Sequence, residues 1–177
     1  MRFELRLEKY NFKEYKEFDL RLIRFDEAVR NLCKQNACGK YGKNHMCPPA
    51  IKDIKEWEKE ILSYKNAIIV TKVYQTENSF DMKAMLEGMV DFQKTLIELR
   101  QDLIDKFPEK EHLVLGAGSC HICKECTYID GEPCRFPEKA FPSVEACGVD
   151  VMSLSKTAGV KYNNGRNTIT YIGVILQ

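Results

Sequence analysis

The sequence has almost no excess of charge of either sign. It carries 27 lysine and arginine residues against 26 aspartate and glutamate residues, which gives a formal net charge of +1 at pH 7. Without a strongly positive field, long-range attraction to nucleic acid or to an anionic membrane surface is weak. We therefore expect no nucleic-acid partner.

The sequence also lacks a signal peptide and any long apolar segment. Residues 1–8 alternate charged and apolar side chains, with no apolar core and no small-residue cleavage site. No uninterrupted apolar run approaches the roughly 20 residues that span a membrane. These absences predict a cytoplasmic protein with no membrane partner.

Two glycine-rich segments lack the residues that nucleotide binding needs. Gly116-Ala117-Gly118 has no third glycine, so it does not match a dinucleotide-binding loop. The segment 39–43 lacks the spacing and the hydroxyl residue of a phosphate-binding loop. There is no internal repeat, low-complexity tract or linker, and 177 residues fit one domain of ordinary size. We expect residues 1–177 to form a single metal-binding domain.

Apolar periodicity predicts an α+β fold. The β-branched run over residues 67–74 indicates a central strand, and residues 168–176 indicate a second. Between them, a long helix should begin at Asn78 or Ser79 and end at Phe107-Pro108. Shorter strands are expected over residues 2–8, 18–22 and 112–115, and shorter helices over residues 26–33, 51–62, 143–146 and 150–158. We expect a small mixed or antiparallel sheet, with the long helix packed on one face and cysteine-rich metal loops.

Cysteine is the residue that the sequence has in excess. Eight cysteines in a protein of this size are more typical of metal ligands than of disulfides, because the cytosol keeps thiols reduced. Cys120, Cys123 and Cys126 follow one another at three-residue spacing, and Cys134 comes after seven further residues. Closely spaced thiolates repel one another, so this pattern predicts a bound metal.

The spacing favours a [4Fe–4S] cluster over zinc. One loop can hold three corners of a cubane cluster while a more distant cysteine supplies the fourth. The first three cysteines match the bacterial ferredoxin run, although that run places its fourth cysteine after three residues, with proline following at once. Zinc sites with four cysteines usually use two separated pairs. Zinc is the alternative cofactor, and free thiols are the third possibility.

A second group of thiols lies upstream. Cys33, Cys38 and Cys47 fall within a loop rich in glycine, lysine and asparagine, and a proline follows Cys47. Three readings are open: a second cubane cluster completed by Cys147, a cluster with one iron open to substrate, and a zinc site or a loop without metal. The possible fourth ligands are Cys147, His45 and His121. Cys147, between Ala146 and Gly148, also fits a small buried residue.

Taken together, these motifs resemble a prokaryotic family of unknown function described as predicted metal-binding proteins. The resemblance covers roughly residues 30–177. It rests on residues 38–43 leading to Cys47-Pro48-Pro49, on residues 118–126, on residues 133–137, and on Pro142-Ser143 followed by Gly148-Val149-Asp150. It implies a prokaryotic cytoplasmic setting and metal ligation by Cys33, Cys38, Cys47, Cys120, Cys123, Cys126 and Cys134. It implies no particular reaction, and Cys147 lies outside the shared motif.

Three functions follow from these expectations. The first is a ferredoxin-like electron carrier or redox subunit with one or two [4Fe–4S] clusters and a redox protein as its partner. The second is an enzyme whose upstream cluster binds substrate at an open iron as a Lewis acid. The third is a binding module stabilised by zinc. Four basic residues lie near the thiols in sequence and would partly offset the negative charge of a thiolate-bound cluster, whereas each of them taken singly is more typical of a solvated loop surface: Lys40, Lys43, Lys124 and Arg135.

Overall fold

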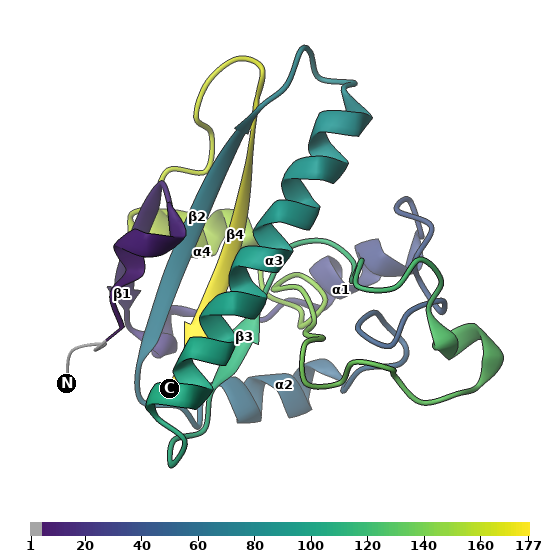
Figure 1. The fold of residues 1–177 in the computed structure, drawn as a ribbon, viewed down its shortest axis with the longest axis horizontal. Helices are drawn as coiled ribbons and strands as arrows, with labels where there is room; N and C mark the ends of the chain where they lie inside the picture. The colour runs from purple at the N-terminus through teal and green to yellow at the C-terminus, as the bar shows by residue number, and fades with distance from the viewer. Residues whose placement is uncertain (1–4) are drawn as a thin grey trace.

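Two long antiparallel strands form the middle of the sheet in the computed structural model, which describes residues 5–177 (Figure 1). β2 (Ala67–Gln75) pairs with β4 (Thr168–Leu176) along its whole length. β1 (Glu14–Phe18) pairs with the other edge of β2, and β3 (Leu113–Leu115) with the other edge of β4. The strand order is therefore β1-β2-β4-β3, and every neighbouring pair is antiparallel.

The central strands are apolar on both sides, so both faces of the sheet need a cover. Along β2, Ile68 and Val70 contribute to one buried cluster and Ala67 and Ile69 to another, as the alternation of side chains in a strand requires. The two clusters are the two halves of the core. They lie on opposite faces of the sheet.

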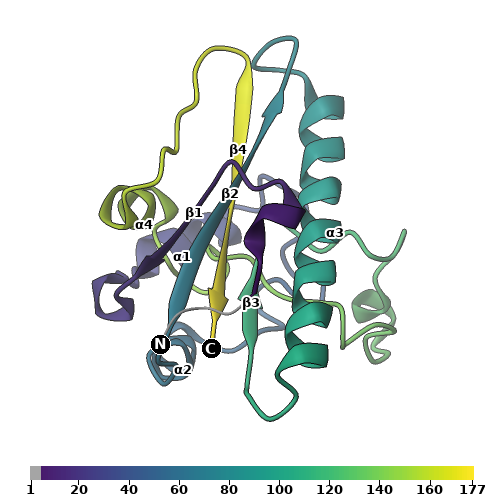
Figure 2. The ribbon, with the colours of Figure 1, turned by 60° about the vertical axis from the view of Figure 1, so that its left-hand side comes forward.

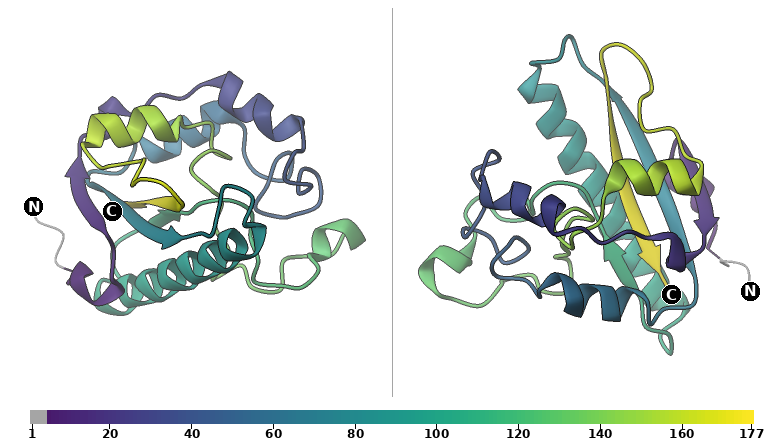
Figure 3. Two further views of the ribbon diagram at one scale, coloured as in Figure 1. Left: turned by 90° about the horizontal axis from the view of Figure 1, so that it is seen from above. Right: turned by 180° about the vertical axis from the view of Figure 1, so that it is seen from behind.

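Helices supply both covers. α3 (Met82–Lys106) packs on one face through Phe92 and its apolar neighbours along the helix (Figure 2). α2 (Ile54–Ile61) and α4 (Val151–Ala158) cover the opposite face, and α1 (Glu27–Lys34) lies to the side of the sheet (Figures 1 and 3). The predicted α+β fold with a long helix on one face is confirmed, and the sheet is antiparallel. No helix within residues 5–177 has both the length and the apolar character to cross a membrane.

An aspartate side chain begins each of these helices. Asp26 accepts a hydrogen bond from the Ala28 amide, Asp150 from the amides of the first turn of α4, and Asp53 forms a capping box with Glu56. α3 begins three to four residues later than predicted, because Asp81 is the residue that caps it. The caps satisfy amides that would otherwise lack acceptors.

Three predicted elements differ in the structure. Residues 5–8 of the expected strand 2–8 are not a strand, and Leu7–Tyr10 forms a 3-10 helix (η1); residues 1–4 lie outside the described part of the chain. The Tyr10 hydroxyl and the Lys9 ammonium both reach the Asp102 carboxylate on α3, which draws the segment onto that helix. These contacts are long-range, so local alternation did not reveal them.

The second and third differences are also local. The expected strand 18–22 is shifted: β1 ends at Phe18, and Asp19 caps a 3-10 helix (η2, Leu20–Leu22) by accepting a hydrogen bond from the Arg21 amide. Residues 143–146 form a turn where a helix was predicted. The reason is that Ser143 makes a bridge to Gly116, and its hydroxyl accepts a hydrogen bond from the Ala146 amide.

The core packing gives a first prediction. Leu96 on α3 is fully buried and packs closely against Gly116 and Gly173. Leu96→Ala should lower the free energy of unfolding by about 2–5 kcal/mol, because the lost methyl groups leave a cavity that the sheet cannot close. Urea denaturation measures the change. Leu86→Ala, at a 46% exposed position of the same helix, is the matched control. Equal losses in the two variants would contradict the assigned packing.

Candidate metal centre

Two loops bring seven of the eight cysteines to one side of the molecule. The first runs from the end of α1 to α2, and the second from β3 to α4. They lie side by side to one side of the sheet, past its β3 edge (Figures 1 and 3). The Asn44 side chain of the first loop donates a hydrogen bond to the Cys120 carbonyl of the second (3.1 Å). Two sets of thiols that are distant in sequence are therefore neighbours in space.

The second loop begins at a point where only glycine fits. Gly116 donates to the Pro142 carbonyl, and the chain then turns at Gly118, whose φ of +66° is a left-handed conformation. A Cβ on Gly118 would also stand 2.2 Å from the Met89 sulfur on α3. The glycine therefore lets the loop lie against α3 just before Cys120.

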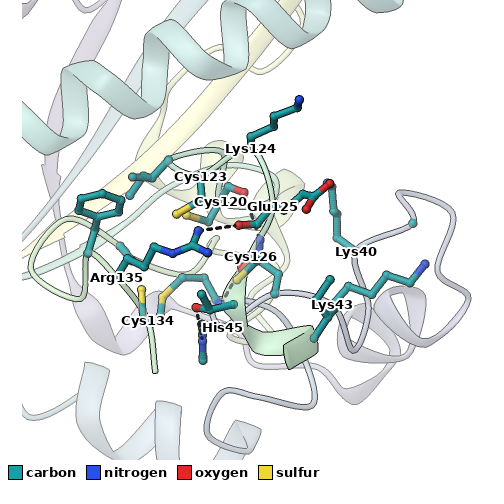
Figure 4. Close-up of a pocket in the computed structure, with 18 residues that line it drawn as sticks. Lys40, Lys43, His45, Cys120, Cys123, Lys124, Glu125, Cys126, Cys134 and Arg135 are labelled. Atoms are coloured by element: carbon teal, nitrogen blue, oxygen red, sulfur yellow. Dashed lines mark hydrogen bonds between the residues drawn. The ribbon is translucent and has the colours of Figure 1, made fainter. Parts of the chain in front are cut away.

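Four cysteines of this loop line one cavity of about 160 Å³: Cys120, Cys123, Cys126 and Cys134 (Figure 4). The displaced fourth cysteine returns to the others because a short 3-10 helix (η3, Thr127–Asp130) reverses the chain at Gly131. The Thr127 hydroxyl then donates to the Pro133 carbonyl (2.8 Å). The seven-residue insertion is therefore a small folded lobe, and it preserves a four-cysteine site.

Four basic residues also line this cavity, and three of them are exposed, as residues of a solvated loop surface are. They are Lys40, Lys43, Lys124 and Arg135. Arg135 Nη1 also donates to the Glu125 carbonyl (3.1 Å), which places its guanidinium among the cysteines (Figure 4). Positive charge in this position would offset the negative charge of a thiolate-bound group.

The upstream thiols line a second cavity of about 180 Å³, which also includes Glu145. Cys33 lies in the last turn of α1, and its carbonyl accepts a hydrogen bond from Asn36. The Asn36 side chain accepts one from the Tyr41 amide (3.0 Å), which curls the loop around Cys38. Cys47 is buried. The loop thus turns three thiols toward one space.

The thiols of each group influence one another. Burial is the main cause that raises the pKa of Cys120; a hydrogen bond with the Ile122 backbone lowers this pKa, and the neighbouring thiols Cys123, Cys134 and Cys126 raise it further. Burial is also the main cause that raises the pKa of Cys47 to about 12. Smaller contributions to that rise come from both groups: Cys38, Cys33, Cys120 and Cys126. Cys47 lines the upstream cavity, and its neighbour Met46 lines the first. Thiolate ligands at such positions bind a cation in exchange for their protons.

The two histidines have partners of their own. The His45 ring lines the first cavity, but its Nε2 lies 3.0 Å from the Glu132 carbonyl oxygen. The His121 ring lies 2.9 Å from the Ser119 hydroxyl, and burial lowers its pKa. Neither ring nitrogen that makes these contacts is directed at a thiol group. The structure accordingly gives both rings a role in holding the loops.

Cys147 lies apart from both cavities. It is fully buried in the core between the sheet and the covering helices, in the cluster that contains Ile61, Val149 and Leu154. Burial raises the pKa of its thiol. The structure thus places it where a small apolar side chain would fit.

Several residues of the site had no strong signal in the sequence. Asn44 is buried in the first loop, where its Oδ1 also accepts from the Met46 amide (2.9 Å). Gln93 on α3 accepts from the His121 amide (2.9 Å). Gln93 is a polar residue within the apolar stripe of α3, and that irregularity could have drawn notice. No comparable irregularity in the sequence marks Arg30 or Glu145.

Cavity size and ligand type together indicate what could bind. A water molecule has a share of about 30 Å³ in the liquid, so each cavity is larger than a single ion requires. Within residues 5–177, no three His, Cys, Asp or Glu side chains already converge at the distances that hold one ion. The cysteines stand around a space instead. Four sulfur donors in one cavity and three in the other are the donor type that binds thiophilic metals.

Comparison with known protein families supports metal binding. Residues 16–177 match the family described as "Predicted metal-binding protein (DUF2284)". The match spans most of the chain, so the protein belongs to this family, as the motifs predicted. The comparisons with curated proteins and with solved structures returned no match.

The contact between the loops gives a second prediction. Asn44→Ala should lower the free energy of unfolding by about 1–3 kcal/mol, because the Cys120 carbonyl and the Met46 amide lose a buried partner. The variant should also retain less metal after anaerobic purification. Elemental analysis and urea denaturation measure the two effects. Asn31→Ala, at an exposed position of α1, should change neither, and an unaltered Asn44→Ala protein would refute the role of this contact.

Proposed function

We propose that this member of the predicted metal-binding family is an iron–sulfur protein that carries electrons. Its principal site would be a [4Fe–4S] cluster bound by Cys120, Cys123, Cys126 and Cys134. A second metal group would bind at Cys33, Cys38 and Cys47. The observation that carries the proposal is the single cavity lined by four thiols and by basic side chains.

The arrangement of the sulfurs favours a cluster over zinc. A tetrahedral zinc ion with bonds of 2.3 Å requires its four sulfurs to lie about 3.8 Å apart. A cubane cluster keeps them farther apart, because each sulfur binds a different iron. A cavity of about 160 Å³ lined by four thiols leaves room for the second geometry. Three ligands in one short loop support the same choice.

The surroundings suit reversible electron transfer. When bound, the cluster supplies one-electron redox chemistry, and the charge near it sets its reduction potential. Arg135 and the three lysines would favour the reduced, more negative form. The proximity of Cys47 to both groups would bring a second metal group near the first. A redox protein is the partner that such an arrangement would serve.

An enzyme is the second candidate function. The upstream cavity contains three cysteines and no fourth, so an iron bound there could leave a position open to substrate. Its walls include the Tyr41 and Ser143 side chains, which could orient a polar ligand. Electron transfer at the four-cysteine cavity would then serve the reaction upstream.

Anaerobic purification tests the proposal directly. The protein should be brown, with broad absorbance at about 400 nm that falls on reduction with dithionite, and should contain about four irons and four sulfides per cluster. Cys123→Ser should lose one cluster of iron, because a ligand is removed. Cys147→Ala should keep all of it, since Cys147 lies in the core.

One result would contradict the electron-carrier proposal, and another would contradict the assignment of its ligands. Colourless protein that contains stoichiometric zinc after anaerobic preparation would identify a zinc-stabilised module. Iron loss in Cys147→Ala equal to that in Cys123→Ser would mean that the core position supplies a ligand.

The basic residues give a further prediction. Arg135→Gln should make the reduction potential of the four-cysteine cluster more negative, by an amount on the order of tens of millivolts, because a nearby positive charge is lost. Voltammetry of the anaerobic protein measures the shift. Arg166→Gln, an exposed arginine of the loop before β4, is the control and should leave the potential unchanged. A positive shift in Arg135→Gln would disprove the assigned role.

A further inference from the structure

A tight turn brings Glu145 to the upstream cavity. Ser143 forms a bridge with Gly116 at the start of the second loop, and the chain then turns through residues 144–148. The turn closes where the Gly148 amide donates to the Glu145 carbonyl (2.9 Å). Gly148 has a φ of +86°, and a Cβ there would lie 2.8 Å from Ile54 on α2. The turn therefore has little freedom, and Glu145 has a fixed position beside the thiols.

One oxygen of the Glu145 carboxyl is buried without a partner. The carboxyl lines the cavity together with Cys33, Cys38 and Cys47. The Ser143 side chain makes a hydrogen bond to the carboxyl, while Oε2 is inaccessible to solvent and has no hydrogen-bond partner. An unpartnered carboxylate oxygen in the interior costs several kcal/mol in general, unless a cation or a donor reaches it.

The buried arginine beside this turn makes its hydrogen bonds to backbone carbonyls. Arg30 on α1 is buried, and its guanidinium donates to the carbonyls of Ala146 (2.7 Å) and Lys52 (2.9 Å). These bonds tie the turn to α1, the helix that carries Cys33. Among the ion pairs formed within residues 5–177, none includes Glu145. Arg30 therefore holds the two sides of the cavity together and leaves the carboxylate without a counter-ion.

The geometry points to Glu145 as the fourth ligand of the upstream metal group. Its Oε2 would complete a set of three thiolates and one carboxylate with Cys33, Cys38 and Cys47. A carboxylate is an established ligand of iron and of zinc, so the inference does not depend on which metal binds. It does rest on the proposed function in one respect, namely that this cavity holds a metal.

A carboxylate would give the upstream site a different character from the four-cysteine site. Both ligand sets carry the same formal charge. Oxygen is a harder donor than sulfur and binds a soft, sulfide-rich iron less firmly, so this ligand would exchange more readily. The iron at that corner would then be the one that opens to a small anionic or carbonyl substrate. This property links the ligand assignment to the enzyme alternative.

The experiment compares Glu145→Gln with Cys47→Ser. All variants are purified anaerobically as the full chain, and iron, zinc and sulfide are counted per chain. Glu145→Gln should lose as many metal atoms as Cys47→Ser, because an amide oxygen is neutral and a weak ligand. Glu58→Gln, an exposed glutamate of α2, should keep the wild-type content. Glu145→Cys should also keep it, since it restores a fourth thiolate.

A second measurement separates a ligand from a structural residue. In the metal-free proteins, Glu145→Gln should unfold at the same urea concentration as the wild type or at a higher one, because the buried charge is removed. In the metal-loaded proteins it should unfold at a lower concentration than the wild type. A metal ligand is the kind of residue whose substitution changes stability in opposite directions with and without the metal. A residue that only packs would lower stability in both states.

Three outcomes would overturn the inference. The first is wild-type metal content in Glu145→Gln. The second is wild-type content in Cys47→Ser, which would mean that the cavity holds no metal. The third is an equal loss of stability with and without metal. The electron-carrier proposal fails separately, if the wild type contains no iron and sulfide or if Cys123→Ser loses none.

Discussion

The hydrogen bond from Asn44 to the Cys120 carbonyl joins two loops that are 76 residues apart in sequence. Every feature of the metal centre depends on this approach. The first loop supplies three thiols, and the second supplies four thiols and the turn that carries Glu145. The rest of the fold keeps the two loops on the same side of the sheet, past its β3 edge. α3 supports the second loop at Gly118, and Arg30 of α1 donates hydrogen bonds to both loops, at the Lys52 carbonyl of the first and the Ala146 carbonyl of the second.

The two cavities have different ligands, and this difference suggests a division of roles. Four cysteines and several cations surround one cavity, which suits a cluster that stays in place and exchanges electrons. Three cysteines and a buried carboxylate surround the other. A site of mixed ligands suits binding and release of a small molecule. Thiols of both groups contribute to the raised pKa of Cys47, so this residue would link the two metal sites.

Much of the fold and most of the thiol ligands could be predicted from local patterns. The β-branched run at residues 67–74, the apolar stripe of α3 and the cysteine spacings are features of short segments. The four thiols from Cys120 to Cys134 line one cavity, as their spacing predicted. The three upstream thiols line a second cavity. Whether they bind metal stays a prediction, and the family match supports it.

The features that the sequence concealed depend on contacts between distant segments. Residues 5–8 alternate like a strand, but Asp102 on α3 draws the segment into η1. Glu145 lies two residues from the cysteine that the sequence offered as a fourth ligand. The turn directs Cys147 into the core and Glu145 into the cavity, and only the path of the chain distinguishes them.

Anomalous X-ray diffraction at the iron absorption edge, from crystals grown without oxygen, tests the account most directly. We expect one strong iron peak within the cavity lined by Cys120, Cys123, Cys126 and Cys134. A second peak should lie between Cys33, Cys38, Cys47 and the Glu145 carboxylate. A single peak at the zinc edge in the first cavity, with no iron signal in either, would contradict the account.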